Sequence, residues 1–288
     1  MSTAIAVPVA IPSAPAYLAR MRQLVSAFIT LSGRRLALSA HTPREVIVPL
    51  VNPVFFALVI APALGKTVGA THSGIDYMTF IAIATVGLLV PINTLFAGIG
   101  VIVDRESGAR RDLLAAPLPR PLLVLGNYSV ALLITMLQVV VLIIAALLRG
   151  AKFHTSGAGV AWFVAATVLL ALAMYGVAET LANRVEKQEE YVGLVPAVAI
   201  LPFFFAGSLF PISVLPSALQ AFAKILPLTH ALALMRYGLV DHQGFGLHEV
   251  WGAGDPTALA ARSLGVLVVF AAAMGYLSVR VFTRAAVR

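Results

Sequence analysis

Two short polar runs share residues with catalytic motifs, and neither motif is complete. Residues 65–67, Gly-Lys-Thr, match the end of a phosphate-binding loop, but that loop needs a glycine where Ile60 stands. His248 and Glu249 match the start of a zinc-protease pattern whose second histidine is replaced by Gly252. The serine-hydrolase pattern Gly-x-Ser-x-Gly is also missing. The sequence therefore predicts no catalytic residue and no nucleotide site.

Other polar clusters are explained by exposure to solvent. Glu189 and Glu190 match the paired glutamates of intramembrane proteases, but Leu194 stands where that motif carries arginine. A solvated carboxylate run beside Arg184 and Lys187 fits better. Residues 239–257 contain side chains of the types that bind metals, and an exposed loop explains them without a metal. These side chains are Asp241, His242, His248, Glu249 and Asp255. We predict no metal site.

Charged residues are most concentrated in residues 104–121, DRESGARRDLLAAPLPRP. This segment separates two apolar runs, 77–103 and 122–148, each long enough to cross a bilayer. A segment this polar cannot lie in hydrocarbon, and its arginines favour the cytoplasmic side of a membrane.

Within this segment, Gly108 offers a break, and residues 109–116 are then expected to form a short helix that presents Leu113 and Leu114 together. Pro117 and the prolines after it end that helix. Arg110 and Arg111 would face acidic partner residues or lipid phosphates, or serve topology alone. We interpret the segment as a docking surface for a soluble partner.

The composition indicates an integral membrane protein. Of 288 residues, 60% are hydrophobic and 11% are charged, whereas soluble domains carry about 25% charged residues. The net charge of +8 comes from arginines scattered between apolar runs, without the aromatic-interleaved basic stripes that bind nucleic acid. Cysteine is absent, which excludes disulfides, thiolate metal sites and cysteine nucleophiles. The Arg-rich, Lys-poor usage is typical of a GC-rich bacterial gene.

We expect an all-α, multi-pass protein of the cell membrane, with one transmembrane domain at residues 17–288. Its six predicted spans are residues 46–64, 77–103, 122–148, 160–182, 191–210 and 258–282. Most basic residues lie before the first span, in 104–121, in 183–190 and at the C-terminus. Both termini are therefore expected to be cytoplasmic.

The N-terminal residues divide into two parts. Residues 1–16 contain prolines but no basic residue, which does not fit a signal peptide, and we expect a disordered tail. Residues 17–38 place apolar residues on one helical face, which is typical of an amphipathic helix lying in the headgroup region. A solvated juxtamembrane stretch is the alternative. The residues assigned to this interfacial helix are Arg20, Arg22, Phe28, Arg34 and Arg35.

Residues 211–237 are apolar but are interrupted by prolines, so each piece is too short to cross a bilayer. We expect two short re-entrant helices on the outer face between spans five and six. An outer loop at 239–257 is expected to follow.

A few polar residues fall within the predicted spans. Asn52, Asn93, Asn127 and Gln138 would line a polar pathway or hydrogen-bond between helices, which is the commoner use. Glu179 lies near the cytoplasmic end of the fourth span, where buried carboxylates often mark proton paths. We favour a structural role, in which Glu179 reaches the interface or pairs with Arg184.

Two stretches resemble the permease subunits of ABC-2 type exporters, particularly the daunorubicin/multidrug-resistance branch. Those permeases carry an acidic-Arg-Glu-x-Gly turn, a Leu-Leu pair, a Pro followed by Arg, and a Gly as the next span starts. The matching residues are Asp104, Arg105, Glu106, Gly108, Leu113, Leu114, Pro117, Arg120 and Gly126. The second match, after span five, comprises Gly207, Phe210, Pro211, Leu215, Pro216, Pro227, Leu228, Thr229 and Arg236. Met235 departs from the family pattern.

The resemblance implies that two permeases pair, either two copies of this chain or one copy with a paralogue. Each would dock on a separate cytosolic ATPase that binds ATP and magnesium, while this chain binds no cofactor and is no enzyme by itself. Residues 104–121 would hold the coupling helix, residues 17–38 would brace the same contact, and the re-entrant helices would cap the pathway. The substrate would be an exported amphipathic or lipophilic molecule, such as a drug or lipid.

A proton-driven secondary transporter with Glu179 as proton carrier is the alternative. Such transporters are often built from two halves of similar sequence, and no convincing internal repeat is present.

Overall fold

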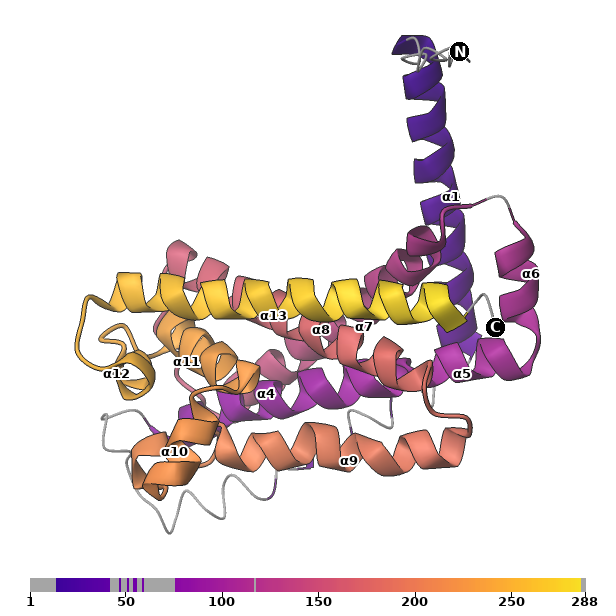
Figure 1. Cartoon of the computed structure of the whole chain (residues 1–288). Helices are drawn as coiled ribbons and strands as arrows, with labels where there is room; N and C mark the ends of the chain where they lie inside the picture. The colour runs from indigo at the N-terminus through magenta and orange to yellow at the C-terminus, as the bar shows by residue number, and fades with distance from the viewer. Residues whose placement is uncertain are drawn as a thin grey trace, which may run out of the picture.

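The computed structural model describes residues 14–41, 47, 51, 54–55, 59, 76–116 and 118–285. Within these ranges all regular structure is helical, as the sequence predicted (Figure 1). The predicted first span at 46–64, together with Asn52, falls largely outside the described residues, and so do Pro117 and most of the predicted tail.

The described helices follow the predicted segments with shifted ends. Their bounds are α1 (Ala14–His41), α4 (Tyr77–Ala97), α5 (Ile99–Glu106), α6 (Ala109–Ala115), α7 (Arg120–Leu148), α8 (Gly157–Ala182), α9 (Gln188–Phe205), η2 (Ile212–Val214), α10 (Ser217–Ala223), α11 (Pro227–Leu239), α12 (Phe245–Trp251) and α13 (Pro256–Ala285). The predicted helices at 17–38 and 109–116 are thus confirmed as α1 and α6. The segment 239–257, expected to be a loop, contains α12, which begins after Gly244 and ends before Gly252, both in left-handed conformations.

Four helical stretches of the described chain are long and apolar enough to cross a membrane. They are Tyr77–Glu106, Arg120–Leu148, Gly157–Ala182 and Pro256–Arg284. The first of these contains α4 and α5, which meet at Gly98. These four confirm predicted spans two, three, four and six as helices of spanning length.

The remaining two predicted features differ from simple spans. α9 is 18 residues long and overlaps the fifth predicted span from residue 191 onward, but its first turn is polar, Gln188-Glu189-Glu190, and it ends at Phe205. The chain turns there because Gly207 takes a left-handed conformation, φ 77°. Ser217–Ala223 and Pro227–Leu239 form a pair bent by 77°, which as one unit would make a fifth stretch of spanning composition.

The long helices run side by side, and α1 crosses them at one end (Figure 1). We call this end the α5–α6 end, because α5, α6 and the last turns of α8 and α13 gather there with α1. We call the opposite end the α12 end. At the α12 end, the backbone N–H of Lys152 donates to Thr79 Oγ1 (2.9 Å), which joins the chain after α7 to the start of α4.

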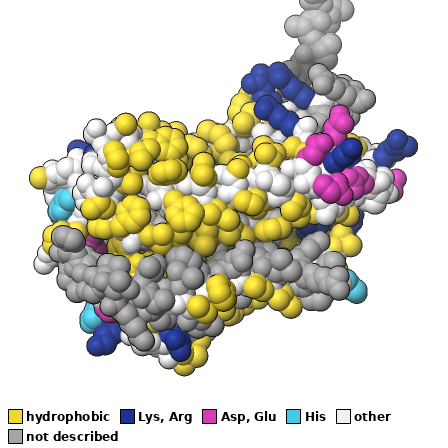
Figure 2. Space-filling view, turned by 90° about the horizontal axis from the view of Figure 1, so that it is seen from below, with side chains coloured by type: hydrophobic (Ala, Val, Ile, Leu, Met, Phe, Trp, Pro, Cys, Tyr) yellow, Lys and Arg dark blue, Asp and Glu magenta, His cyan; other side chains and the backbone are white. Residues whose placement is uncertain are grey.

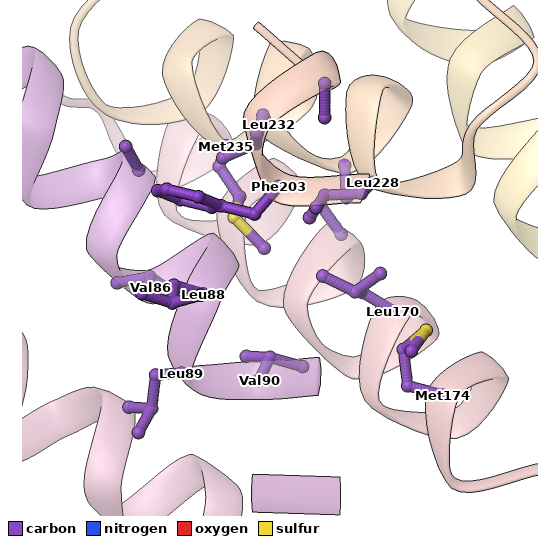
Figure 3. Close-up of a cluster of buried hydrophobic side chains, with 14 of the residues drawn as sticks. Val86, Leu88, Leu89, Val90, Leu170, Met174, Phe203, Leu228, Leu232 and Met235 are labelled. Carbon is purple, nitrogen blue, oxygen red and sulfur yellow. The ribbon is translucent and has the colours of Figure 1, made fainter. Parts of the chain in front are cut away.

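The core lies around α4, nearly all of whose residues are buried. Figure 3 shows side chains of α4, α8, α9 and α11 in one buried cluster, including Val90 of α4, Leu170 of α8, Phe203 of α9 and Leu232 of α11. Leu232 approaches α4 closely at Gly87, since a Cβ there would lie 2.6 Å from Leu232 Cδ2.

The surface is apolar between two charged ends. On the face shown in Figure 2, hydrophobic side chains form a band, and charged side chains gather at either end of it. Large apolar side chains on α7 and α13 are also exposed, including Leu133 (55%), Leu137 (61%) and Val269 (69%). Soluble proteins rarely expose apolar surface on this scale, so the protein is membrane-embedded.

Candidate functional site at the α5–α6 end

The turn between α5 and α6 is built by local backbone geometry. Gly108 has a φ of 79°, in the left-handed region that glycine adopts without strain. Its own N–H bonds to Arg105 O (3.3 Å), and Arg111 N–H bonds to Gly108 O (2.9 Å). The break predicted at Gly108 is therefore confirmed, and it turns the short α6 away from α5.

An ion pair fixes α1 to this turn. Arg34 Nη2 lies 3.0 Å from Asp104 Oδ1, and the Asp104 side chain is only 13% exposed. The next residue, Arg35, is buried and donates to Ala97 O (3.4 Å) at the end of α4. Its guanidinium occupies the space that a side chain at Gly100 would need. The predicted interfacial helix and the predicted docking segment are thus in direct contact.

Arg105 holds the end of α8. Its guanidinium donates to Ala182 O (3.0 Å), Val185 O (2.8 Å) and Glu186 O (2.7 Å). The last carbonyl groups of a helix have no partner within the helix and carry partial negative charge, so a cation there is stabilising. Arg105 therefore connects the 104–121 segment to the chain between α8 and α9.

Two further arginines contact α13. The Arg110 guanidinium lies over the Phe282 ring, 4.8 Å from its centroid, a cation–π contact. Burial lowers the pKa of the Arg110 guanidinium, and the nearby Glu179 carboxylate opposes that shift. Arg120 donates to Thr283 O (3.3 Å) in the last turn of α13. The turn is thus anchored to α1, α8 and α13.

Leu113 and Leu114 are half-buried. Both pack against a buried cluster that includes Leu123, Tyr128 and Phe282. The two leucines lie together, as expected, on the side of α6 that packs against this cluster, and their part in docking stays a prediction. The exposed residues of the turn form what we call the turn surface: Glu106, Ser107, Gly108, Arg111, Asp112 and Ala115.

Glu179 is fully buried one turn before the end of α8. It accepts hydrogen bonds from Tyr175 Oη (3.1 Å) and Asn183 Nδ2 (3.3 Å), both within four residues along the chain. Arg184, the partner we expected, is exposed. Glu179 is therefore held by local hydrogen bonds, which supports a structural role and corrects the expected partner.

The other predicted pathway residues pack between helices. Asn93 of α4 donates to Thr135 Oγ1 of α7, which is the interhelical use that the sequence left open. Gln138 is buried on α7. Asn127 lines two small cavities of about 20 Å³ and 30 Å³, each with room for about one water molecule. Cavities of this size do not hold a drug-sized ligand.

α1 leaves an apolar face uncovered. Met21 (44%), Val25 (52%) and Ile29 (63%) are exposed beside Arg22, and together with Ser26 and Thr30 they line an open hollow of about 430 Å³. Arg20 is exposed and Phe28 is half-buried. The interfacial position expected for residues 17–38 stays a prediction.

At the α12 end, Arg236 ties α11 to the turn after α9. Its buried guanidinium donates to Gly207 O (2.8 Å) and Ser208 O (3.0 Å) and lies 3.7 Å from the centroid of the Phe80 ring. The structure thus brings together Gly207 and Arg236, two residues of the second family match.

The prolines of this region begin its short helices. Pro211 precedes η2, Pro216 precedes α10 and Pro227 is the first residue of α11, positions where the missing N–H costs no helix bond. Phe210 is exposed and Leu215 is half-buried. Sequence reasoning missed Glu249, which accepts from Ile212 N–H (3.3 Å) and Ser213 Oγ (2.7 Å) and so fixes η2 against α12.

Two acidic residues near α12 accept hydrogen bonds from backbone N–H groups close to them in the chain. Asp241 accepts from Gly246 N–H (2.9 Å), and Asp255 accepts from Ala258 N–H (2.8 Å) at the start of α13. Among the described residues, no group of three acidic or histidine side chains is placed to hold a metal.

Comparison with known proteins identifies the family of this helical arrangement. The model of the ABC-2 type transporter family matches residues 26–240, which include the C-terminal part of α1, the α5–α6 turn and α11. This chain belongs to the ABC-2 type transporter family. It is a membrane-embedded permease subunit.

Two curated relatives have similar length. The inner membrane transport permease YadH of Escherichia coli (strain K12) is 25% identical over 231 residues, which cover 79% of this chain and 82% of the relative. Nodulation protein J of Sinorhizobium fredii is 25% identical over 238 residues, which cover 82% of this chain and 84% of the relative. The match to the family model, residues 26–240, extends through both regions singled out in the sequence.

Proposed function

We propose that this chain is the membrane-spanning subunit of an ATP-driven exporter of the daunorubicin/multidrug-resistance branch, powered by a separate ATPase. The observation that carries the proposal is the α5–α6 turn. Three helices anchor it through Arg34–Asp104, Arg105 and Arg110, while its turn surface is charged and exposed. A rigidly held, exposed turn is what a soluble subunit needs if its movement is to reach the membrane helices.

The distribution of charge supports an orientation. Arg34, Arg105, Arg110, Arg111 and Arg120 all lie at the α5–α6 end, and short cytoplasmic segments are enriched in arginine and lysine. We place this end in the cytoplasm of a bacterial cell and the α12 end outside. With the first predicted span at 46–64 and α9 as the fifth, the chain has six spans and two cytoplasmic termini.

The direction of α1 supports an interfacial position. α1 crosses the long helices (Figure 1), and its exposed face combines Met21, Val25 and Ile29 with Arg20 and Arg22. Such a face suits the boundary between acyl chains and headgroups. α1 would therefore lie along the membrane and brace the turn through the Arg34–Asp104 pair.

The α12 end supports an outer cap. The bent pair α10–α11 is held to α9 by Arg236 and to α12 through η2. A pair bent by 77° fits helices that enter the outer leaflet and leave on the same side. The exposed apolar faces of α7 and α13 would contact lipid, a second permease and an amphipathic or lipophilic substrate such as a drug or lipid.

The proposal is tested by reversing charges on the turn surface. A candidate ATPase encoded beside this gene is co-expressed with the chain, and the complex is purified through the permease. Glu106→Lys with Arg111→Glu should lower recovery of the ATPase at least about tenfold, because each charge-assisted contact contributes about 1.5–3 kcal/mol. Membrane insertion should be unchanged.

Lys152→Glu is the matched control, since Lys152 is exposed at the α12 end. It should leave ATPase recovery at the wild-type level. Equal recovery with the double variant and with the control would contradict the docking assignment.

A further inference from the structure

α8 is the one long helix that Arg105 holds at the α5–α6 end. Its 26 residues give a length of about 39 Å at ~1.5 Å per residue. The three bonds from Arg105 go to backbone carbonyls at and just beyond the end of α8. A displacement of Arg105 would therefore act on the α8 backbone directly and would not depend on side-chain rotamers.

The first turn of α8 is locked to α11 by a backbone contact between two glycines. A Cβ added to Gly159 would overlap Gly238 O, and a Cβ added to Gly238 would overlap Gly159 O. Thr155, just before α8, donates its hydroxyl to Gly238 O (2.8 Å). Small residues allow helix backbones to approach this closely within membranes. At this end too, the helix is held through its backbone.

α11 is the longer arm of the bent α10–α11 pair, and it is buried along most of its length. Contacts with the backbone thus connect α8 to the α5–α6 turn at one end and to the bent pair at the other. Packed interfaces move as units because interiors are close-packed and do not deform continuously.

We propose that α8 transmits displacement of the α5–α6 turn to the α10–α11 pair, with Arg105, Gly159 and Gly238 as positioning residues. This inference rests on the proposed function, because it requires an ATPase that moves the turn. It adds the route by which that movement crosses the membrane. The route runs through α8, and movement of the bent pair depends on both contacts, that of Arg105 with the end of α8 and that of Gly159 with Gly238.

The test uses a fluorophore that reports movement of α10. The chain contains no cysteine, so Ser217→Cys gives a single labelling site at the exposed start of α10. The labelled full chain is reconstituted in vesicles with its ATPase, and an environment-sensitive maleimide dye is followed upon ATP addition. The wild-type background should give an ATP-dependent change in emission.

Arg105→Gln should reduce that change about tenfold, the scale of one lost charge-assisted hydrogen bond. Arg184→Gln is the matched control, because Arg184 is an exposed arginine in the loop whose carbonyl groups accept hydrogen bonds from Arg105. The control should respond like the wild-type background. Arg105→Lys should recover part of the response, since it keeps the charge but loses the forked donor geometry.

At the Gly159–Gly238 contact, Gly238→Ala should abolish the ATP-dependent emission change. Gly265→Ala should not, because a Cβ at Gly265 meets open space. Thr155→Val is a milder variant that removes only the hydroxyl bond, and it should weaken the response. ATPase recovery and ATP hydrolysis are measured in every variant and should be retained, which separates loss of transmission from loss of folding or docking.

A wild-type-sized response in both Arg105→Gln and Gly238→Ala, with ATPase bound, would overturn the α8 route while leaving the proposed function intact. Failure of the unmutated chain to bind an ATPase would instead refute the proposed function, and the α8 route would fall with it.

Discussion

Individual arginines at the α5–α6 end have different roles. In the sequence they were signals of topology and candidate contacts for a partner. In the structure, Arg105 and Arg120 donate to backbone carbonyls, and Arg34 binds Asp104. Arg111 is exposed and available on the turn surface. Arginine thus fixes the turn in the structure, and we propose that it also orients the chain in the membrane.

Glu179→Gln tests whether the buried carboxyl is a proton carrier. The substitution keeps an acceptor for Tyr175 and removes the ionisable group. With ATPase bound, we expect the ATP-dependent emission change of the Ser217→Cys label to stay within about twofold of wild type, since ~0.5–1.5 kcal/mol is the usual value of one neutral hydrogen bond.

The same vesicles are given a pH step without ATPase as the counterpart measurement. Our account expects no emission change from the unmutated chain. A change driven by the pH step that disappears in Glu179→Gln would favour proton coupling instead.

At this scale the sequence predicted residue types better than partners. The turn at Gly108 was predicted correctly, because left-handed turns favour glycine. The contacts of Arg34 with Asp104 and of Arg35 with Ala97 O were not predicted. The packing of Leu113 and Leu114 against the cluster that contains Phe282 could not be predicted, since Phe282 lies at the far end of the chain. Local pattern carries no information on such distant contacts.

Helices pack closely where glycine permits it. Gly176 of α8 lies against α13, and a Cβ there would be 2.7 Å from Met274 Cβ and 2.8 Å from Met274 C. These are atoms of a helix backbone and its first side-chain carbon, so they cannot swing aside as a flexible side-chain tip can. The α8–α13 spacing therefore depends on this glycine.

Gly176→Ala should destabilise the protein by about 1–3 kcal/mol, the usual cost of overpacking. Gly193→Ala is the control, because a Cβ at Gly193 on α9 meets open space. Alanine there should stabilise by roughly 0.5–1 kcal/mol, since glycine is a poorer helix residue. Thermal unfolding of the purified proteins in detergent measures both. A destabilisation of equal size in the two variants would show that helix propensity and not spacing decides the outcome.

Helix positions were more predictable than helix ends. α4, α7, α8 and α13 follow from apolar runs of spanning length, and α6 follows from Gly108 and the prolines after it. The end of α9 at Phe205 and the presence of α12 were missed. Both depend on tertiary contacts, of Arg236 with Gly207 and of Glu249 with η2, which the local sequence does not encode.

The whole molecule combines an apolar body with two polar ends of different character. One end carries the anchored α5–α6 turn, and the other carries the bent pair, η2 and α12. The family model and the two curated relatives cover most of this arrangement. A chain of this kind needs an external source of energy, and the turn surface is where we expect that source to bind.

The most direct test of this account is the accessibility of Ser107 on the turn surface. In a chain with no native cysteine, Ser107→Cys is treated with a membrane-impermeant maleimide in intact cells and in inside-out vesicles. We predict labelling only in inside-out vesicles, with protection when the ATPase is bound. Labelling from outside intact cells, or labelling in inside-out vesicles that bound ATPase does not reduce, would contradict it.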